Sequence, residues 1–127
     1  MGMFSAFEGL EVEQVRVSWS LRLVFEVGSA GAAATFVDLA NFMFTDAEGC
    51  KSEVSVEQDP STAAPVLGLL HHRVSGARVD QWELEFAFDT GARLVCPPDP
   101  RFEAWSARLP DGGMIYCPPG GGVGSPD

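Results

Sequence analysis

Basic residues are scarce in this sequence. Eight lysines and arginines stand against 18 aspartates and glutamates, which gives the 127-residue chain a formal net charge of −10 at pH 7. A nucleic-acid-binding protein needs cations that displace the counterions of the phosphate backbone, and adhesion to anionic membranes needs cations as well. We therefore expect neither nucleic acid nor membrane among the partners of this chain.

Long apolar runs are also missing. No stretch approaches the roughly 20 apolar residues of a transmembrane helix, and the start lacks the basic, apolar and small-residue succession of a signal peptide. We therefore expect a cytoplasmic protein. Hydrophobic residues make up 46% and charged residues 20% of the chain, a balance typical of globular rather than disordered proteins. The length fits one domain.

Residue types that carry chemistry are few. Cys50, Cys96 and Cys117 cannot all pair within one chain and form no Cys-x-x-Cys, so we expect free thiols, two on strands (Cys96, Cys117) and one in a loop. His71 and His72 are adjacent, and adjacent side chains on a strand point to opposite faces. We expect them to be polar residues at a helix end, and we predict no metal site.

Catalytic motifs are likewise missing. The chain has no Gly-x-Ser-x-Gly elbow, and the glycines of residues 120–124 precede no helix whose N-terminus could hold a phosphate. Glu83 and Glu85 alternate with an aromatic face, which predicts the solvated side of a sheet. We therefore expect no catalytic residues, no cofactor and no enzyme activity.

What the sequence has in abundance is alternation with a period of two, the pattern of half-buried strands. Odd positions from Val15 to Val27 are apolar, Trp19 among them, which predicts one bent strand or two strands broken near Ser18–Ser20, followed by a turn at Gly28–Gly31. Further strands are expected over residues 35–44, 51–58, 73–79 with a bulge at Gly76, 82–88, 92–96, 102–109 and 114–117.

A helix start is indicated by Asp59-Pro60, a capping side chain followed by proline at the first helical position. We expect one short helix near residues 61–70, in which Pro65 is tolerable only in the first turn. The fold class is thus α+β, mainly β: a curved antiparallel sheet, small sandwich or half-barrel of about 7–8 strands. Residues 1–117 form the domain, and residues 118–127 are expected to be a flexible Gly/Pro-rich tail.

The acidic residues are unevenly spread, and five of them fall within fourteen positions that contain one cation, Lys51. These five are Asp46, Glu48, Glu53, Glu57 and Asp59. A dense acidic patch on a rigid domain can steer and hold a basic protein partner. The alternative is charge that serves solubility alone.

Short segments of the second half follow one another in a recognisable order. They are Phe86-Ala-Phe-Asp-Thr-Gly91, Leu94-Val-Cys-Pro-Pro-Asp99, Phe102-Glu-Ala-Trp105, Leu109-Pro-Asp-Gly112 and Cys117-Pro-Pro-Gly-Gly121. This succession resembles a family of small, mostly actinobacterial proteins of unknown function with a (Tyr/Phe)-Glu-Ala-Trp strand and a Cys-Pro-Gly-Gly ending. The likeness covers about residues 60–121. Pro119 is an additional proline, and the closing aromatic strand of the family is replaced here by Gly-Val-Gly-Ser-Pro-Asp.

Within the Phe-Glu-Ala-Trp segment, Glu103 and Trp105 would share one face of a strand. An amphipathic Trp–Glu face predicts a pocket, a binding rim or a contact that pins the sheet. The family that the segment resembles supplies no catalytic residue to carry over.

Three functions follow from these observations. In size, acidity and β-rich composition the chain is similar to immunity proteins encoded beside bacterial toxins, which implies a non-enzymatic domain that occludes a basic toxin cleft through its acidic patch. One alternative is a small-molecule-binding domain whose curved sheet forms a pocket lined by Trp19, Trp82, Phe86 and Trp105. Another is a homo-oligomeric structural domain that pairs edge strands, so the chain is expected to be a monomer or a homodimer.

Overall fold

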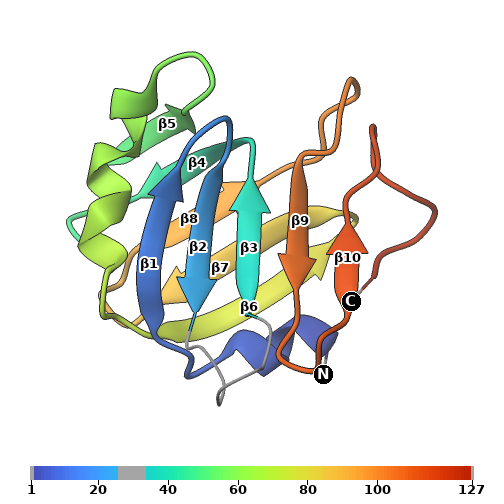
Figure 1. The fold of residues 1–127 in the computed structure, drawn as a ribbon, viewed down its shortest axis with the longest axis horizontal. Helices are drawn as coiled ribbons and strands as arrows, with labels where there is room; N and C mark the ends of the chain where they lie inside the picture. The colour runs from blue at the N-terminus through green and yellow to red at the C-terminus, as the bar shows by residue number, and fades with distance from the viewer. Residues whose placement is uncertain (1, 26–33, 127) are drawn as a thin grey trace.

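The computed structural model describes residues 2–25 and 34–126, which contain ten strands in two open antiparallel sheets (Figure 1). The first sheet has the order β1 (Val12–Val17), β2 (Leu21–Phe25), β3 (Phe36–Leu39), β9 (Trp105–Arg108), β10 (Met114–Tyr116). The second has the order β5 (Lys51–Ser55), β4 (Asn41–Thr45), β8 (Arg93–Cys96), β7 (Glu83–Phe88), β6 (Val74–Asp80). The predicted mainly β fold is confirmed, in its sandwich form.

The long alternating segment is a hairpin of β1 and β2. Val17 pairs with Leu21, and the Ser18 N–H donates to the Ser20 carbonyl over 3.0 Å, so the predicted break at Ser18–Ser20 is confirmed. Trp19 forms the apex and is 79% exposed. The expectation that Trp19 faces the core is wrong, because alternation holds along a strand and ends at a turn. The predicted turn at Gly28–Gly31 lies outside the described residues.

The single strand expected over residues 35–44 is two strands in different sheets. Leu39 is buried from β3 and Phe42 from β4, so the parity of the buried positions changes at Ala40. The Ala40 N–H donates to the Ala104 carbonyl over 2.9 Å and fixes this crossing between the sheets. Both halves share a β-branched and aromatic composition, and only the change of parity marks the crossing.

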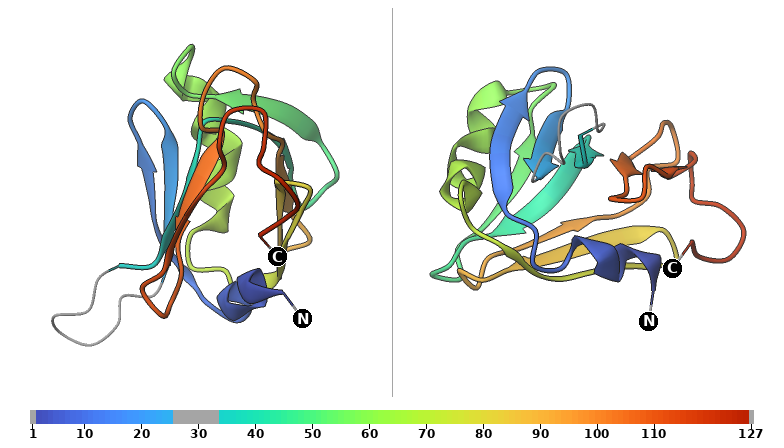
Figure 2. Two further views of the ribbon diagram at one scale, coloured as in Figure 1. Left: turned by 90° about the vertical axis from the view of Figure 1, so that its right-hand side faces the viewer. Right: turned by 60° about the horizontal axis from the view of Figure 1, so that its bottom comes forward.

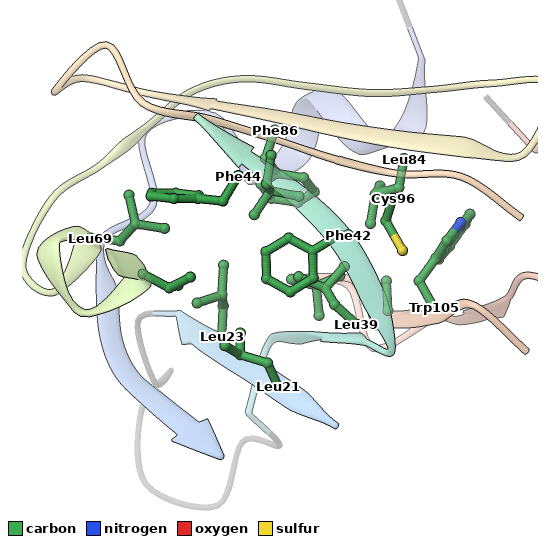
Figure 3. Close-up of a cluster of buried hydrophobic side chains, with 14 of the residues drawn as sticks. Leu21, Leu23, Leu39, Phe42, Phe44, Leu69, Leu84, Phe86, Cys96 and Trp105 are labelled. Atoms are coloured by element: carbon green, nitrogen blue, oxygen red, sulfur yellow. The ribbon is translucent and has the colours of Figure 1, made fainter. Parts of the chain in front are cut away.

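Aromatic rings fill the core between the sheets (Figure 3). The ring centroid of Phe7 lies 5.2 Å from that of Phe86 and 5.3 Å from that of Phe25, while Phe4 meets Trp105 edge to face at 5.6 Å. Phe4 and Phe7 come from η1 (Met3–Phe7), a 3-10 helix that the sequence patterns do not predict. Burial of each phenyl ring is worth about 1.5–3 kcal/mol, so the two rings anchor the N-terminal segment.

The predicted short helix is η2 (Pro60–Leu69), a 3-10 helix capped by Asp59. Its buried residues, Ala63, Val66 and Leu69, recur every three positions, the period of a 3-10 helix. Pro65 lies beyond the first turn of η2, so the expectation that proline is tolerable only in the first turn is wrong. The hydrogen bonds of a 3-10 helix do not use the i−4 carbonyl, with which the proline ring would clash in an α-helix. η2 contacts β1 and β5 and lies between the sheets (Figure 2). Among the described residues, no helix has the length and apolarity that a membrane crossing needs.

The remaining strands form hairpins close to the predicted positions. The register of β6 against β7 shifts between Val74 and Gly76, which confirms the bulge expected at Gly76. The turn from β6 to β7 holds two residues with positive φ, Gln81 and Trp82. Positive φ at both positions suits a two-residue hairpin turn but is uncommon for bulky side chains, and this turn also receives contacts from outside it.

One source of those contacts is the C-terminal segment, residues 118–126. Gly122 lies against the Trp82 indole so closely that a Cβ atom there would come within 2.8 Å of Cζ2. The Gly120 N–H donates to the Asp99 carbonyl over 2.7 Å, and Ser125 Oγ donates to the Val79 carbonyl over 3.2 Å. The flexibility expected of this tail stays a prediction.

Candidate functional site

The five clustered carboxylates follow one border of the second sheet, where β5 is the outermost strand (Figure 1). We call this set the acidic edge: Asp46 and Glu48 in the β4–β5 turn, Glu53 on β5, and Glu57 and Asp59 in the turn into η2. Glu53 is exposed because it lies next to the buried Val54 on a strand whose side chains alternate between faces. The local β pattern thus places residues distant by up to thirteen positions along one border.

Two of the five carboxylates fix the backbone of the edge. Asp46 Oδ1 accepts from the N–H groups of Glu48 (3.0 Å) and Cys50 (2.9 Å) and closes the hairpin turn. Asp59 Oδ1 accepts from Oγ (2.7 Å) and N–H (3.0 Å) of Ser61, and these bonds lower the pKa of Asp59. Both turns are therefore held in shape, and Glu48, Glu53 and Glu57 are the members of the set whose carboxylates accept no hydrogen bond from the described residues.

The acidic edge has little compensation from cations. Within residues 2–25 and 34–126, none of the five carboxylates lies within 4.0 Å of a cationic nitrogen. Three of the arginines are engaged with other carboxylates: Arg78 and Arg93 with Glu85, and Arg101 with Asp99. Because these charges are unpaired and all but the half-buried Asp46 are exposed, their field extends into solvent over about a Debye length, roughly 8 Å at physiological salt.

Chemically, this arrangement suits electrostatic docking. In the described part of the chain, no three His, Cys, Asp or Glu side chains gather closely enough to hold a metal ion. The carboxylates are spread along a border rather than converging on one point. Such a surface raises the association rate of a basic partner and selects against acidic ones.

The predicted rim of Glu103 and Trp105 does not form. Strand β9 begins at Trp105, so Glu103 precedes it and is exposed, whereas Trp105 is 2% exposed and lies in the core. Trp105 Nε1 donates to the Trp82 carbonyl over 2.9 Å, which ties β9 to the β6–β7 turn. Of the three alternatives, the geometry of Trp105 fits a contact that pins the sheets together.

The predicted aromatic pocket does not assemble either. Trp19 lies at an exposed apex, Phe86 and Trp105 are enclosed in the core, and Trp82 is half-buried under the tail. A hollow of about 390 Å³ lies instead beside η1, on the outer side of β6 and β7, where Gly76 and Ala87 leave space. Small residues follow no distinctive sequence pattern, so the sequence alone does not predict this hollow.

The thiols and imidazoles lie close to their predicted places, except that Cys117 follows β10 instead of lying on a strand. Cys96 and Cys117 are buried, which raises the pKa of both thiols, and Cys50 is exposed in the β4–β5 turn. His71 and His72 follow η2 and have different neighbours: His72 Nδ1 lies 3.0 Å from Asp89 Oδ1, and His71 Nδ1 lies 3.9 Å from Glu11 Oε2. The two rings therefore do not share a site.

A second polar site, on the outer face of the first sheet, was not predicted. A hollow of about 250 Å³ is lined by Arg16, Ser18, Ser20, Arg22 and Asp38. The sequence does contain an indication of this hollow. Arg16 and Arg22 are equidistant from Trp19, so a hairpin with Trp19 at its apex places the two arginines opposite each other. The pairing of Arg16 with Arg22 can be predicted only once residues 12–25 are identified as a hairpin rather than one strand.

One comparison with known proteins gave a match. A family described as a family of unknown function (DUF6188) has a model that matches residues 3–126. No curated protein and no solved structure matches the chain. Because the match spans nearly the whole sequence, including η1 and the tail, the chain belongs to this family of unknown function.

Proposed function

We propose that this member of the family is a non-enzymatic protein-binding domain that holds a basic partner on its acidic edge. One observation carries the proposal: five carboxylates line an exposed border, and none of them is in an ion pair within the described residues. Two of the five carboxylates also hold the turns at either end of the border in shape. A rigid, uncompensated surface of this kind loses little entropy on docking.

The most specific form of this proposal is an immunity protein that covers the basic active-site cleft of a toxin. Occlusion requires no chemistry of the domain, only a surface complementary to the cleft in charge and shape. The small size and the strongly acidic composition support this form. The immunity role, a toxin partner and a cytoplasmic, bacterial setting are parts of the proposal.

The test is a pull-down from the native organism with tagged chain at low and at high salt. A triple variant, Glu48→Lys, Glu53→Lys and Glu57→Lys, reverses the free charges of the edge and spares the two capping aspartates. A matched control, Glu13→Lys, Asp80→Lys and Glu103→Lys, makes the same change in net charge at other exposed positions. We expect one stoichiometric basic partner that binds wild type and control and is lost with high salt or the edge variant.

Other outcomes distinguish the forms of the proposal. If the captured partner is an enzyme, stoichiometric addition of the domain should abolish its activity, because occlusion closes the cleft. A partner that stays active would remove the immunity form and leave protein binding in place. Capture that is equal with the edge variant would refute the role of the acidic edge altogether.

A small-molecule-binding domain is the second candidate, and the hollow beside η1 is the observation in its favour. Its lining combines Ser5, Glu8, Arg78 and Glu85 with a floor of small residues. A metabolite screen by thermal shift tests it, with Ala87→Leu as a variant that fills the hollow. A compound that stabilises wild type but not Ala87→Leu would favour this candidate, and light scattering would separate the homo-oligomeric alternative from a 13.6 kDa monomer.

A further inference from the structure

Two arginines face each other directly across the β1–β2 hairpin. The register pairs Arg16 with Arg22, and like charges in directly opposed positions destabilise an antiparallel pair. Asp38 compensates one of them through bonds of 2.9 Å to Nε and 2.6 Å to Nη2 of Arg22. Arg16 donates its Nε–H to the neutral amide of Gln14 over 2.9 Å. An anion placed between the two arginines would therefore relieve a repulsion that is built into the hairpin.

The hollow between these arginines offers hydrogen-bond donors to such an anion. Ser18 and Ser20 flank it, and their hydroxyl groups make no hydrogen bond within the described residues. The terminal N–H groups of Arg16 are also free of partners in that part of the chain. A volume of about 250 Å³ accommodates a carboxylate, and guanidinium groups bind carboxylates with charge-assisted bonds of suitable planar geometry.

An exposed indole stands at the apex of the hairpin. Trp19 is 79% exposed there, and its neighbours in the sequence, Ser18 and Ser20, line the hollow. The Ser18–Ser20 hydrogen bond closes the turn that carries Trp19. Tryptophan and arginine dominate the hot spots of protein interfaces, because a large rigid ring and a planar cation bury much area with few lost rotamers.

We propose that this hairpin, residues 16–22, binds a partner segment that places an Asp or Glu carboxylate between Arg16 and Arg22 and covers Trp19 with an apolar side chain. The surface selects an acidic segment, whereas the acidic edge selects a basic partner, so this inference goes beyond the proposed function. The net charge of −10 repels acidic partners at long range. Binding here therefore depends on short-range fit to the hairpin.

Selection of a random displayed peptide library against the full chain tests this proposal. We expect enriched peptides with an Asp or Glu beside a large apolar residue. Their affinity, measured by fluorescence anisotropy, should fall about tenfold or more with Trp19→Ala and with Arg16→Gln. Arg101→Gln, an exposed arginine on another loop, and Val123→Ala, an exposed apolar residue of the tail, are the matched controls and should bind as wild type does.

Several outcomes would overturn the proposal. These are a library that yields no binder, enriched peptides without acidic residues, or affinity that is unchanged in both hairpin variants. Circular dichroism of the variants checks that the fold is intact, which is expected because both altered side chains are exposed. Light scattering that shows a wild-type dimer and a Trp19→Ala monomer would instead identify a second copy as the occupant. The acidic-edge variant should bind these peptides at least as tightly as wild type, because it repels acidic segments less, so failure here and failure of the proposed function are separable.

Discussion

Trp105→Phe tests whether the indole of Trp105 pins the two sheets together. The substitution removes the hydrogen bond from Nε1 to the Trp82 carbonyl, worth about 1 kcal/mol, and leaves that carbonyl with the weak Cys117 Sγ contact at 3.8 Å. It also leaves a cavity where the larger ring packed against Phe4, at a cost of about 1–2 kcal/mol. The expected loss in the free energy of unfolding is therefore about 2–3 kcal/mol, a large part of the stability of a small domain.

Urea denaturation followed by far-UV circular dichroism measures this loss. With a slope of about 1–3 kcal/mol per molar urea, the midpoint should fall by about 0.7–3 M. Trp19→Phe is the matched control: the same change at an exposed apex should alter the free energy of unfolding by less than about 0.5 kcal/mol. Equal effects of the two substitutions, or none at position 105, would refute the placement of Trp105 in the core.

Two further predictions concern the cap of η2 and the thiols. Asp59→Ala should lower the urea midpoint at neutral pH, because the Asp59 carboxylate accepts two hydrogen bonds from Ser61. These bonds lower the pKa of Asp59 below its ordinary value of 3.8. The extra stability of wild type is therefore complete above pH 3.8 and disappears as the pH falls through the lowered pKa. A difference that does not change with pH would contradict this role. In native protein, Ellman's reagent should react quickly with Cys50 alone and in denaturant with all three cysteines, because burial raises the pKa of Cys96 and Cys117; more than one fast thiol in native protein would contradict their burial.

Strands that are bounded by turns were predictable from the sequence. The hairpin of β1 and β2, the bulge at Gly76 and the helix start at Asp59 each depend on neighbouring residues. The crossing at Ala40 was not predicted, because it depends on which sheet each half of the segment joins. η1 was missed for a related reason: its two phenylalanines follow no strand or helix period, and only the tertiary core gives them their place.

The candidate sites also divide into those that depend on neighbouring residues and those that depend on the tertiary fold. The acidic edge is a property of one continuous segment, and its members stay together whatever the topology. The rim of Glu103 and Trp105 depended on the strand starting at Phe102, whereas the chain bends before β9 and turns Trp105 inward. Prediction of the hollow at Arg16 and Arg22 required the register of the β1–β2 hairpin. The sequence left open whether this segment is one bent strand or two strands.

The affinity of the purified basic partner, measured across a series of salt concentrations, is the most direct test of the role of the acidic edge. We predict an affinity that falls steeply with salt for wild type and for the control with Glu13, Asp80 and Glu103 reversed. The variant with Glu48, Glu53 and Glu57 reversed should bind weakly, with little dependence on salt. If that variant binds as tightly as wild type, or if both triple variants lose affinity equally, the acidic edge is not the binding surface.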